Sequence, residues 1–526
     1  MRLIHQYLLE AACRTPDKTA LICDDKPLVY DAFIHRMQAL SGLLIDAGLR
    51  KGDRALIVIS DKMDFLVACY AVIAAGGLAV PIMEGAAAAT IQQVAHDCTP
   101  QTLLSTSQDL TAYPDLRERV RCSIMLLDTT GPASPHDPWH RATIVPHDAL
   151  HRGNGSLRTP DIQEDDGAFI LYTSGTTGKK KGVLLSHRNL IQSTLNINEF
   201  MGIDADIREF VAIPLTHSFG FGRSRCVLFV GGTLVVTNGM FNPVAAVQQM
   251  REHRCDALSS VPSGFALFFG RMESSLCRIG PQVRFVEIGS APMRLDHKLK
   301  LTEVFPNARL CMHYGLTEAS RSAFIEFRHD RDKLDTVGRP APHVEIAILP
   351  DQEPGEKDGQ TGEIAVRGAH VAAGYWQNGD LNAQRFTEDG WFKTGDYGFL
   401  DEDGYLHLLG RKDDIINMGG LKISPIEVEE SIRTAYPHCE VCVVGIPDPA
   451  GLVGEIPVLC YVSRDGSSIT LPELSHALSS RLDRHKIPRI VYRLEQLSKT
   501  ENGKILRHEL RRTLLDGVVP QHEKSV

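Results

Sequence analysis

The sequence predicts an α/β protein: a large N-terminal domain of helix-covered, parallel-rich sheets plus a small β region, followed by a smaller α+β C-terminal domain. Three observations support this. Helical apolar spacing alternates with short apolar strands in the first part of the chain. Short strands separated by turns follow Gly338, and a fresh strand and helix pattern begins after about residue 410. A chain of 526 residues is also too long for one ordinary core.

The composition indicates a folded, acidic protein. Hydrophobic residues make up 43% of the chain, and 56 Lys and Arg stand against 65 Asp and Glu, which gives a formal net charge of −9. This balance excludes nucleic acid as a general partner. The N-terminus has no apolar core followed by a cleavage site, no long apolar run occurs, and the cysteines are mostly scattered singly. We therefore expect a cytoplasmic protein without a membrane span.

Helix and strand alternate in the N-terminal part. Helical apolar spacing predicts helices at 30–47 and 61–75, and apolar runs predict strands at 55–59 and 78–82. Such alternation makes a parallel sheet covered by helices. Between about 105 and 161 the signal weakens into Pro, His, Gly and Asp, so we expect a surface connection without chemistry there.

A polar loop between two predicted strands carries the strongest functional signal. Residues 169–172 and 183–185 are apolar, and residues 173–182 between them hold four hydroxyl side chains, three glycines and three lysines. Glycines admit close backbone approach, successive amides hold an anion, and lysines supply charge. The loop is therefore a candidate grip for a polyphosphate, with a solvated hairpin turn as the alternative. A Walker-type loop is excluded, because no Gly-Lys-Ser/Thr follows at the required spacing.

Candidate ligand turns follow the next predicted strands. Strands at 284–288 and 308–312 open into small-residue turns, and ligands of parallel sheets collect at the carboxyl ends of strands. These turns are expected to face the same crevice as the polar loop. Glu318 there suits Mg²⁺, which needs oxygen donors and bridges phosphates; a surface glutamate is the alternative. Further elements are predicted as a helix from His187, strands at 210–214, 233–237 and 257–261, and a helix at 243–253.

The last third predicts the small β region, a linker and the second domain. Strands at 344–349 and 362–366 lead to Asp396, which can accept hydrogen bonds from ribose hydroxyls or hold a turn. The charged, glycine-bearing stretch 410–422 predicts a linker, and we place the boundary so that the domains are 1–412 and 413–526. Lys504 follows Asn-Gly, a tight-turn pair that holds its ammonium on a loop tip; a solvated lysine is the alternative.

The order of these motifs closely resembles that of the adenylate-forming superfamily of acyl-CoA synthetases, peptide-synthetase adenylation domains and luciferases, over nearly the whole chain. The resemblance implies that a carboxylate attacks the α-phosphate of MgATP to give an acyl-adenylate, after which a thiol displaces AMP. It implies ATP, Mg²⁺ and coenzyme A, with a carrier-protein phosphopantetheine as the alternative thiol. A nucleotide-binding regulatory protein without turnover is a remoter alternative. The motifs are 173–181, 289–292, 314–318, 394–396, 410–413 and 502–504.

The resemblance also implies roles for single residues. Lys504 would bridge the substrate carboxylate and the α-phosphate, and Thr317 would reach the α-phosphate. Glu318 and Thr173 would hold Mg²⁺, and Asp413 would be the hinge of the smaller domain. The implied nucleotide-binding residues are Thr173, Ser174, Gly175, Thr176, Thr177, Gly178 and Lys181 at the phosphates, Tyr314 at the adenine, Asp396 and Arg411 at the ribose, and, with no separate role assigned, Gly289, Ser290, Ala291, His313 and Gly315.

Three positions depart from the usual motifs of that superfamily. Lys180 stands where the polar loop usually carries proline, and Ser498 replaces a proline ahead of the terminal lysine motif. Neither change removes a charge or a hydroxyl with a chemical role. Asn417 stands where some relatives have lysine and resembles the acetyl-CoA synthetase version of this motif, which favours coenzyme A as the acceptor.

The stretch that follows the strand at 210–214 bears on the identity of the acid. It lacks the aspartate usual in amino-acid adenylation domains, which disfavours an α-amino acid because an unpaired buried ammonium is costly. If Arg223 points into the slot, the acid carries a second acidic or strongly polar group. If Arg223 and Arg225 face the protein or solvent, which we favour, a plain acyl chain follows. His217 resembles the aromatic or histidine gate of acyl and aryl relatives. The expected slot residues are His217, Ser218, Phe219, Gly220, Phe221 and Arg223.

Overall fold

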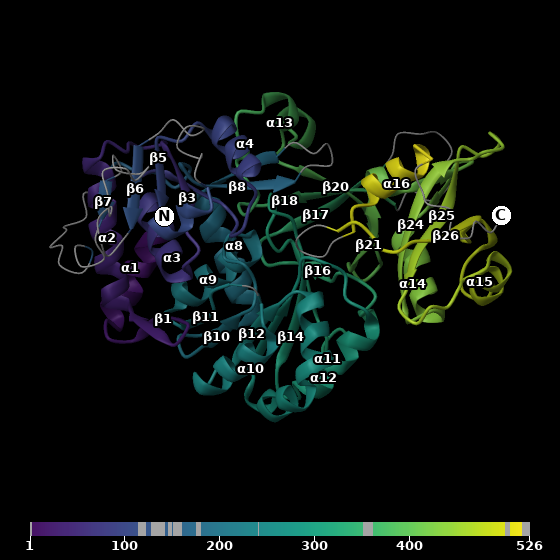
Figure 1. Cartoon of the computed structure of the whole chain (residues 1–526), viewed down its shortest axis with the longest axis horizontal. Coiled ribbons are helices and arrows are strands. Elements are labelled where there is room, and N and C mark those ends of the chain that lie inside the picture. The colour runs from purple at the N-terminus through teal and green to yellow at the C-terminus, as the bar shows by residue number, and fades with distance from the viewer. Residues whose placement is uncertain are drawn as a thin grey trace. The chain divides into compact units, whose positions relative to one another are not determined.

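The computed structural model describes residues 3–113, 123–127, 143–145, 150, 160–174, 180–239, 241–350, 361–499 and 505–517. The chain divides into two compact units (Figure 1). The first comprises Met1–Glu345 and Val366–Phe392, and the second comprises Ile346–Ala365 and Lys393–Val526. A functional boundary at 412/413 stays a prediction.

A nine-stranded sheet forms one half of the first unit. Its central strands are parallel, while the edge strands β2, β15 and β16 are antiparallel to their neighbours. The strand order is β16-β15-β14-β13-β12-β10-β11-β1-β2. The strands are β1 (Thr19–Cys23), β2 (Lys26–Val29), β10 (Arg208–Val211), β11 (Thr233–Val236), β12 (Ala257–Ser260), β13 (Phe285–Ile288), β14 (Arg309–Tyr314), β15 (Ala323–Glu326) and β16 (Arg339–Pro340).

An eight-stranded sheet forms the other half, in the order β19-β9-β8-β4-β3-β5-β6-β7. Strands β8, β4, β3, β5, β6 and β7 pair in parallel, and β9 pairs antiparallel with β8 and β19. The strands are β3 (Arg54–Val58), β4 (Leu78–Pro81), β5 (Thr102–Ser105), β6 (Ser123–Leu127), β7 (Thr143–Val145), β8 (Gly167–Ser174), β9 (Lys180–Ser186) and β19 (Gly374–Tyr375).

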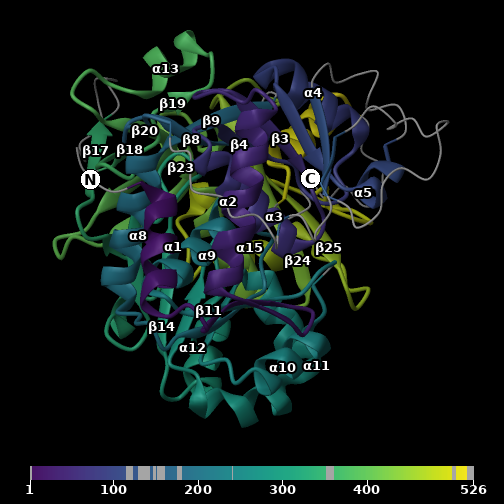
Figure 2. The ribbon, with the colours of Figure 1, turned by 90° about the vertical axis from the view of Figure 1, so that its left-hand side faces the viewer.

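Helices cover these sheets, as the alternating pattern predicted. Helix α3 contacts β1 of one sheet and β3 and β4 of the other, which explains why every residue from Asp64 to Ala74 is buried. Helices α1, α2 and α3 pack together (Figure 2). The longer helices are α1 (Ile4–Arg14), α2 (Tyr30–Asp46), α3 (Lys62–Ala74), α4 (Ala88–Cys98), α8 (His187–Met201), α9 (Ser218–Val230), α10 (Pro243–Glu252), α11 (Pro262–Ile279) and α12 (Leu295–Val304), and the short ones α5 (Ser107–Thr111) and α13 (Gly379–Arg385).

The expected surface connection between about 105 and 161 is wrong in part. Residues 123–127 and 143–145 form β6 and β7, which extend the eight-stranded sheet at its edge. Both strands are short, and the polar residues around them conceal their apolar runs from a search for longer patterns.

The second unit holds three small sheets. Strands β17 (Glu345–Pro350), β18 (Gly362–Arg367), β20 (Phe392–Leu400) and β21 (Leu406–Arg411) form the predicted small β region. The predicted linker is wrong in part, because residues 410–422 contain the end of β21, a hairpin strand β22 (Ile416–Met418) and most of its partner β23 (Leu421–Ile423). The third sheet and its helices are β24 (Cys439–Pro447), β25 (Glu455–Ser463), β26 (Ile490–Arg493), α14 (Pro425–Ala435), α15 (Leu471–Leu478) and α16 (Arg507–Leu515).

In the part of the chain that the structure describes, no helix combines the length and the apolar run that crossing a membrane requires.

Candidate nucleotide and acid site

The polar loop is carried by the hairpin of β8 and β9. In its register Thr173 lies opposite Lys181, and Ser174 opposite Lys180. Directly opposed residues of a strand pair project from the same face, so the Thr173 hydroxyl and the Lys181 ammonium belong to one face of the hairpin. Gly175, Thr176, Thr177 and Gly178 lie outside the described residues. The hairpin thus fixes both ends of the loop, and the polyphosphate grip itself stays a prediction.

The turns after β13 and β14 lie at one edge of the nine-stranded sheet. The two strands are parallel neighbours, with Ile288 opposite Met312. A side chain at Gly289 would place a Cβ 2.0 Å from the His313 ring, so glycine is required there. The next residue, Ser290, has a left-handed φ of +72°. The structure therefore brings together the segments that carry Gly289, Ser290, Ala291, His313, Tyr314 and Gly315.

The predicted metal ligand Glu318 is held by two contacts. Tyr375 Oη donates to Glu318 Oε1 at 2.6 Å, and the Ala372 amide donates to the Glu318 carbonyl at 2.7 Å. Tyr375 belongs to β19, which pairs with β9 at Val183 and so ties this turn to the loop hairpin. Glu318 and Thr173 both offer oxygen donors, the ligand type that Mg²⁺ takes, and therefore fit this ion.

A small cavity joins several predicted segments within the first unit. Its void is about 10 Å³, room for roughly one water, so a substrate enters only if side chains move. Three predicted site residues line it, namely Ser218 and Phe221 of α9 and Thr317 of the turn after β14. The other lining residues are Leu171, Leu185, Asn189, Leu190, Ser193, Ser320, Arg225 and His370.

Asn189 and His370 are cavity residues that the sequence did not point out. Asn189 enters the wall because the cap of α8 holds it: its amide donates to Ser186 Oγ at 3.2 Å, and its Oδ1 accepts from the Ser186 amide at 2.9 Å. Its side-chain nitrogen donates to the Ala369 and Val371 carbonyls at 3.0 and 2.6 Å. The Ser186-His187-Arg188-Asn189 capping pattern was a usable signal for the helix start, although not for the cavity.

A buried network of ion pairs joins Glu209 of β10 and Glu287 of β13 to Arg223 and Arg321. Arg223 Nε donates to Glu209 Oε1 at 2.8 Å, and its Nη1 lies 3.0 Å from Glu287 Oε2. Arg321 Nε donates to Glu287 Oε1 at 3.0 Å, and His313 Nδ1 lies 2.7 Å from the same oxygen. Burial lowers the pKa of His313, so the ring is neutral. Two guanidiniums thus balance two carboxylates.

Arg223 is absent from the cavity wall and is 1% exposed within this network. Its contacts are those of a paired structural group. Phe219 lies against the network, its ring centroid 4.6 Å from that of His313. Gly220 packs on the loop between β10 and α9, where a Cβ would lie 2.2 Å from the Pro214 carbonyl oxygen. His217 is the N-cap residue of α9.

The predicted ribose residues lie in the second unit. Asp396 and Arg411 are cross-strand neighbours on β20 and β21, and Arg411 Nε lies 3.1 Å from Asp396 Oδ1. Arg411 Nη1 also donates to the Thr394 carbonyl at 3.0 Å. Asp413 lies in a 3₁₀ turn, Lys412–Asp414. Lys504 lies outside the described residues.

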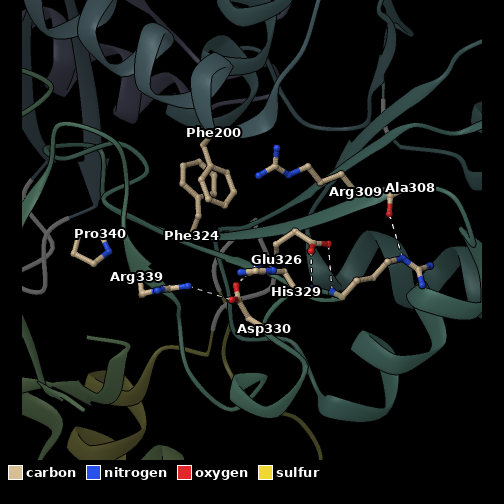
Figure 3. Close-up of a pocket in the computed structure, with 10 residues that line it drawn as sticks. Phe200, Ala308, Arg309, Phe324, Glu326, His329, Asp330, Arg339 and Pro340 are labelled. Carbon is tan, nitrogen blue, oxygen red and sulfur yellow. Dashed lines mark hydrogen bonds and ion pairs between the residues drawn. The ribbon is translucent and has the colours of Figure 1, made fainter. Parts of the chain in front are cut away.

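A larger pocket of about 780 Å³ contains none of the predicted site residues (Figure 3). Its aromatic wall is the stacked pair Phe200 and Phe324, with ring centroids 4.3 Å apart. Its charged groups largely interact with other residues of the pocket wall. Arg339 lies 3.7 Å from Asp330, and Asp330 Oδ2 accepts a hydrogen bond from the Glu326 backbone amide at 2.9 Å.

The first unit has two parallel-rich sheets with a helix between them. A polar hairpin loop and a turn that carries a carboxylate are tied together by a short strand. These features define the class as a nucleotide-dependent α/β enzyme. The comparisons specify the family. The model described as AMP-binding enzyme matches residues 8–376, and that described as AMP-binding enzyme C-terminal domain matches residues 427–504. The chain belongs to the AMP-binding enzyme family, which confirms the predicted resemblance and fold class.

Curated relatives match along nearly the whole chain. The feruloyl-CoA synthase of Amycolatopsis sp is 29% identical over 501 residues, which cover 95% of this chain and 96% of that protein. The oxalate–CoA ligase of Arabidopsis thaliana is 29% identical over 510 residues, covering 95% and 96%.

Solved structures share the fold. ATP-bound MatB from Rhodopseudomonas palustris superposes with a TM-score of 0.85 at 27% identity, covering 98% of this chain and 99% of that one. The o-succinylbenzoate CoA synthetase MenE from Bacillus subtilis, in complex with the acyl-adenylate intermediate OSB-AMP, gives a TM-score of 0.79 at 26% identity, covering 96% and 97%.

Proposed function

We propose that this protein is an AMP-forming acid–thiol ligase that activates a carboxylic acid with MgATP and transfers the acyl group to coenzyme A. One observation carries the proposal: both family models match, and proteins similar over 95% of the chain are CoA ligases. The convergence of Leu171, Ser218 and Thr317 on one cavity supports it, because it joins the loop hairpin to the expected acid slot.

In this proposal the chain positions reactants and neutralises charge. The loop amides and Lys181 hold the β- and γ-phosphates, and Mg²⁺, when bound at Glu318 and Thr173, offsets phosphate charge. A carboxylate oxygen of the acid attacks the α-phosphorus, the bond to pyrophosphate breaks, and the thiol sulfur then displaces AMP from the acyl carbon. Lys504 stabilises the charge that builds between the carboxylate and the α-phosphate, and Thr317 donates to the α-phosphate.

The remaining assignments belong to the same proposal. Tyr314 packs on the adenine, Asp396 and Arg411 bind the ribose, and the part beyond 412 turns about Asp413 between the two half-reactions. A carrier-protein phosphopantetheine is the alternative acceptor, since it presents the same thiol. We also place the enzyme in the cytoplasm, because each cysteine among the described residues is a free thiol.

Pyrophosphate exchange with a panel of carboxylic acids tests the first half-reaction. We expect exchange that requires Mg²⁺ and one class of acid, followed by an acyl-CoA product that mass spectrometry identifies. If a thioester product forms only when a holo carrier protein is supplied, the carrier protein and not coenzyme A is the acceptor. If no acid supports pyrophosphate exchange although the protein binds ATP, the result would favour a nucleotide-binding regulatory protein instead.

A further inference from the structure

Arg225 differs from the other buried arginines of the described chain. Arg36, Arg223 and Arg321 each have a carboxylate partner. Arg225 is 3% exposed and has none among the described residues. It lies two residues after Arg223 on α9, and residues two apart on a helix point to nearly opposite sides. Arg223 thus faces the ion network, while Arg225 faces α8.

The hydrogen bonds of Arg225 all go to neutral acceptors, and its guanidinium carbon also lies 5.5 Å from the centroid of the Phe221 ring. Nη1 donates to the Leu190 carbonyl and to Thr194 Oγ1, the latter at 2.8 Å, and Nη2 donates to Ser193 Oγ at 3.2 Å. The buried Nε has no hydrogen-bond partner. Since Nη2 carries two hydrogens, the Nε–Nη2 edge keeps two donors available. A side-by-side pair of guanidinium donors is the fork that binds a carboxylate.

The small cavity of about 10 Å³ lies beside Arg225. Arg225 lines it together with Ser218 and Thr317, so it belongs to the acid site and not to a separate one. His370 is the other titratable wall residue, and burial lowers its pKa to about 4, so it is neutral at pH 7. Burial lowers the pKa of Arg225 to about 10, which leaves it protonated. The wall therefore carries a single positive charge, and an unpaired buried charge costs several kcal/mol.

We infer that the acid is a short dicarboxylate: one carboxylate is adenylated, and the other binds the Nε–Nη2 edge of Arg225. This rests on the proposed function, because the first carboxylate must reach the α-phosphate near Thr317. The second carboxylate takes no part in bond making and only compensates the guanidinium. The small void favours a short spacer between the two groups. Arg225, rather than Arg223, thus carries the preference for an acidic substrate.

Pyrophosphate exchange with C3–C6 dicarboxylates and with monocarboxylates of equal length tests this. Wild type should prefer the dicarboxylate in kcat/KM by about 10²-fold. In Arg225→Met that ratio should fall by about 10²-fold, while Arg225→Lys, which keeps the charge and loses the fork, should lie between. Arg251→Met, on the exposed face of α10, should keep the wild-type ratio. A wild type that prefers monocarboxylates, or an unchanged ratio in Arg225→Met, overturns the inference.

Binding separates this inference from the proposed function. Succinate and its C3–C6 homologues, scanned with a non-hydrolysable ATP analogue, should raise the Tm of wild type and not that of Arg225→Met. If no acid supports exchange, the proposed function fails, and the Tm shift alone decides the dicarboxylate site. Equal shifts in both proteins overturn it. If Arg225→Met does not fold, Arg225→Lys takes its place in the same comparison.

Discussion

Glu287 lies in the middle of a buried strand and is nevertheless ionised. Burial alone raises its pKa, but Arg321, Arg223 and His313 together outweigh that effect and hold the pKa well below its ordinary range. Removing one partner would leave an uncompensated buried charge, a change that typically costs about 3–5 kcal/mol. The network therefore stabilises the strand ends at the proposed adenine site only while it stays complete.

Lys504 is the residue on which adenylation is predicted to depend most. In Lys504→Ala we expect pyrophosphate exchange to fall by roughly 10²-fold or more, because a cation that offsets developing charge is lost. Thioester formation from supplied acyl-adenylate should be largely spared. Lys499→Ala is the matched control: it removes a nearby lysine that pairs with Glu440 at 2.6 Å, and should leave both half-reactions intact. Equal loss of both half-reactions in Lys504→Ala would contradict the assigned role.

For single residues, the sequence pointed to candidates within motifs and did not point to the buried ion pairs. Glu318 stood out because it follows a strand end near a lysine-rich loop. Glu287 is the only charge in strand β13, and Glu209 follows Arg208 in strand β10; their partners Arg223 and Arg321 come from other elements. Only the fold brings such charges together, so a search for local patterns passes over them.

Helix and strand boundaries followed from apolar spacing where the elements are long. Residues 30–47 were predicted as a helix, and α2 spans Tyr30–Asp46. The prediction failed for the short strands β6 and β7 and for the β22–β23 hairpin, because three to five residues carry too little periodicity. Turn residues such as Gly419 and Gly420, both with positive φ, were read as part of a linker for the same reason.

Two glycines on helices should respond in opposite ways to alanine. Gly220→Ala should destabilise by about 2 kcal/mol or more, because the new methyl overlaps the Pro214 carbonyl and must push α9 away from the loop that follows β10. In Gly270→Ala nothing lies within 4 Å of the new Cβ, so α11 should gain about 0.5–1 kcal/mol from helix propensity. Urea denaturation of the two variants measures both; destabilisation of equal size in each would contradict the packing argument.

Two buried histidines join helices of the first unit and make the molecule sensitive to acid. Burial lowers the pKa of His5 on α1 to about 4. Burial first, and His5 second, lower the pKa of His187 on α8 to about 3. The unfolded chain binds protons near pH 6.5 and the folded one does not, so this stability is present above pH 6.5 and lost as the pH falls toward 4.

His5→Leu should remove its share of that loss, up to about 3 kcal/mol between pH 6.5 and 4. Neither ring nitrogen of His5 has a hydrogen-bond partner, so leucine should cost little at pH 8. The Tm of wild type and His5→Leu, followed from pH 8 to 4.5, should diverge as the pH falls. His96→Leu, an exposed change on α4, should track wild type. Parallel curves for wild type and His5→Leu would refute the link.

A rotation about Asp413 is the whole-molecule motion that the proposed two-step reaction requires. Asp413→Pro fixes φ near −65°, so one of the two conformations should be lost. We expect adenylation and thioester formation to separate by at least about tenfold in single-turnover assays. Glu402→Pro is the control, because Glu402 is the second residue of the turn in which the Gly404 amide donates to the Asp401 carbonyl, a position that favours proline. Loss of both half-reactions to the same extent in Asp413→Pro would argue against a hinge there.

Strand β19 is only two residues long, yet it pairs with the hairpin that carries the polar loop and presents the hydroxyl that holds Glu318. A ligand that orders the β8–β9 hairpin therefore also orders the turn that carries Glu318, and the reverse holds. If nucleotide and cation both favour the ordered form of this connection, each should raise the protein's affinity for the other, and thermodynamic reciprocity makes the two factors equal. Nucleotide and cation would then bind to the protein together.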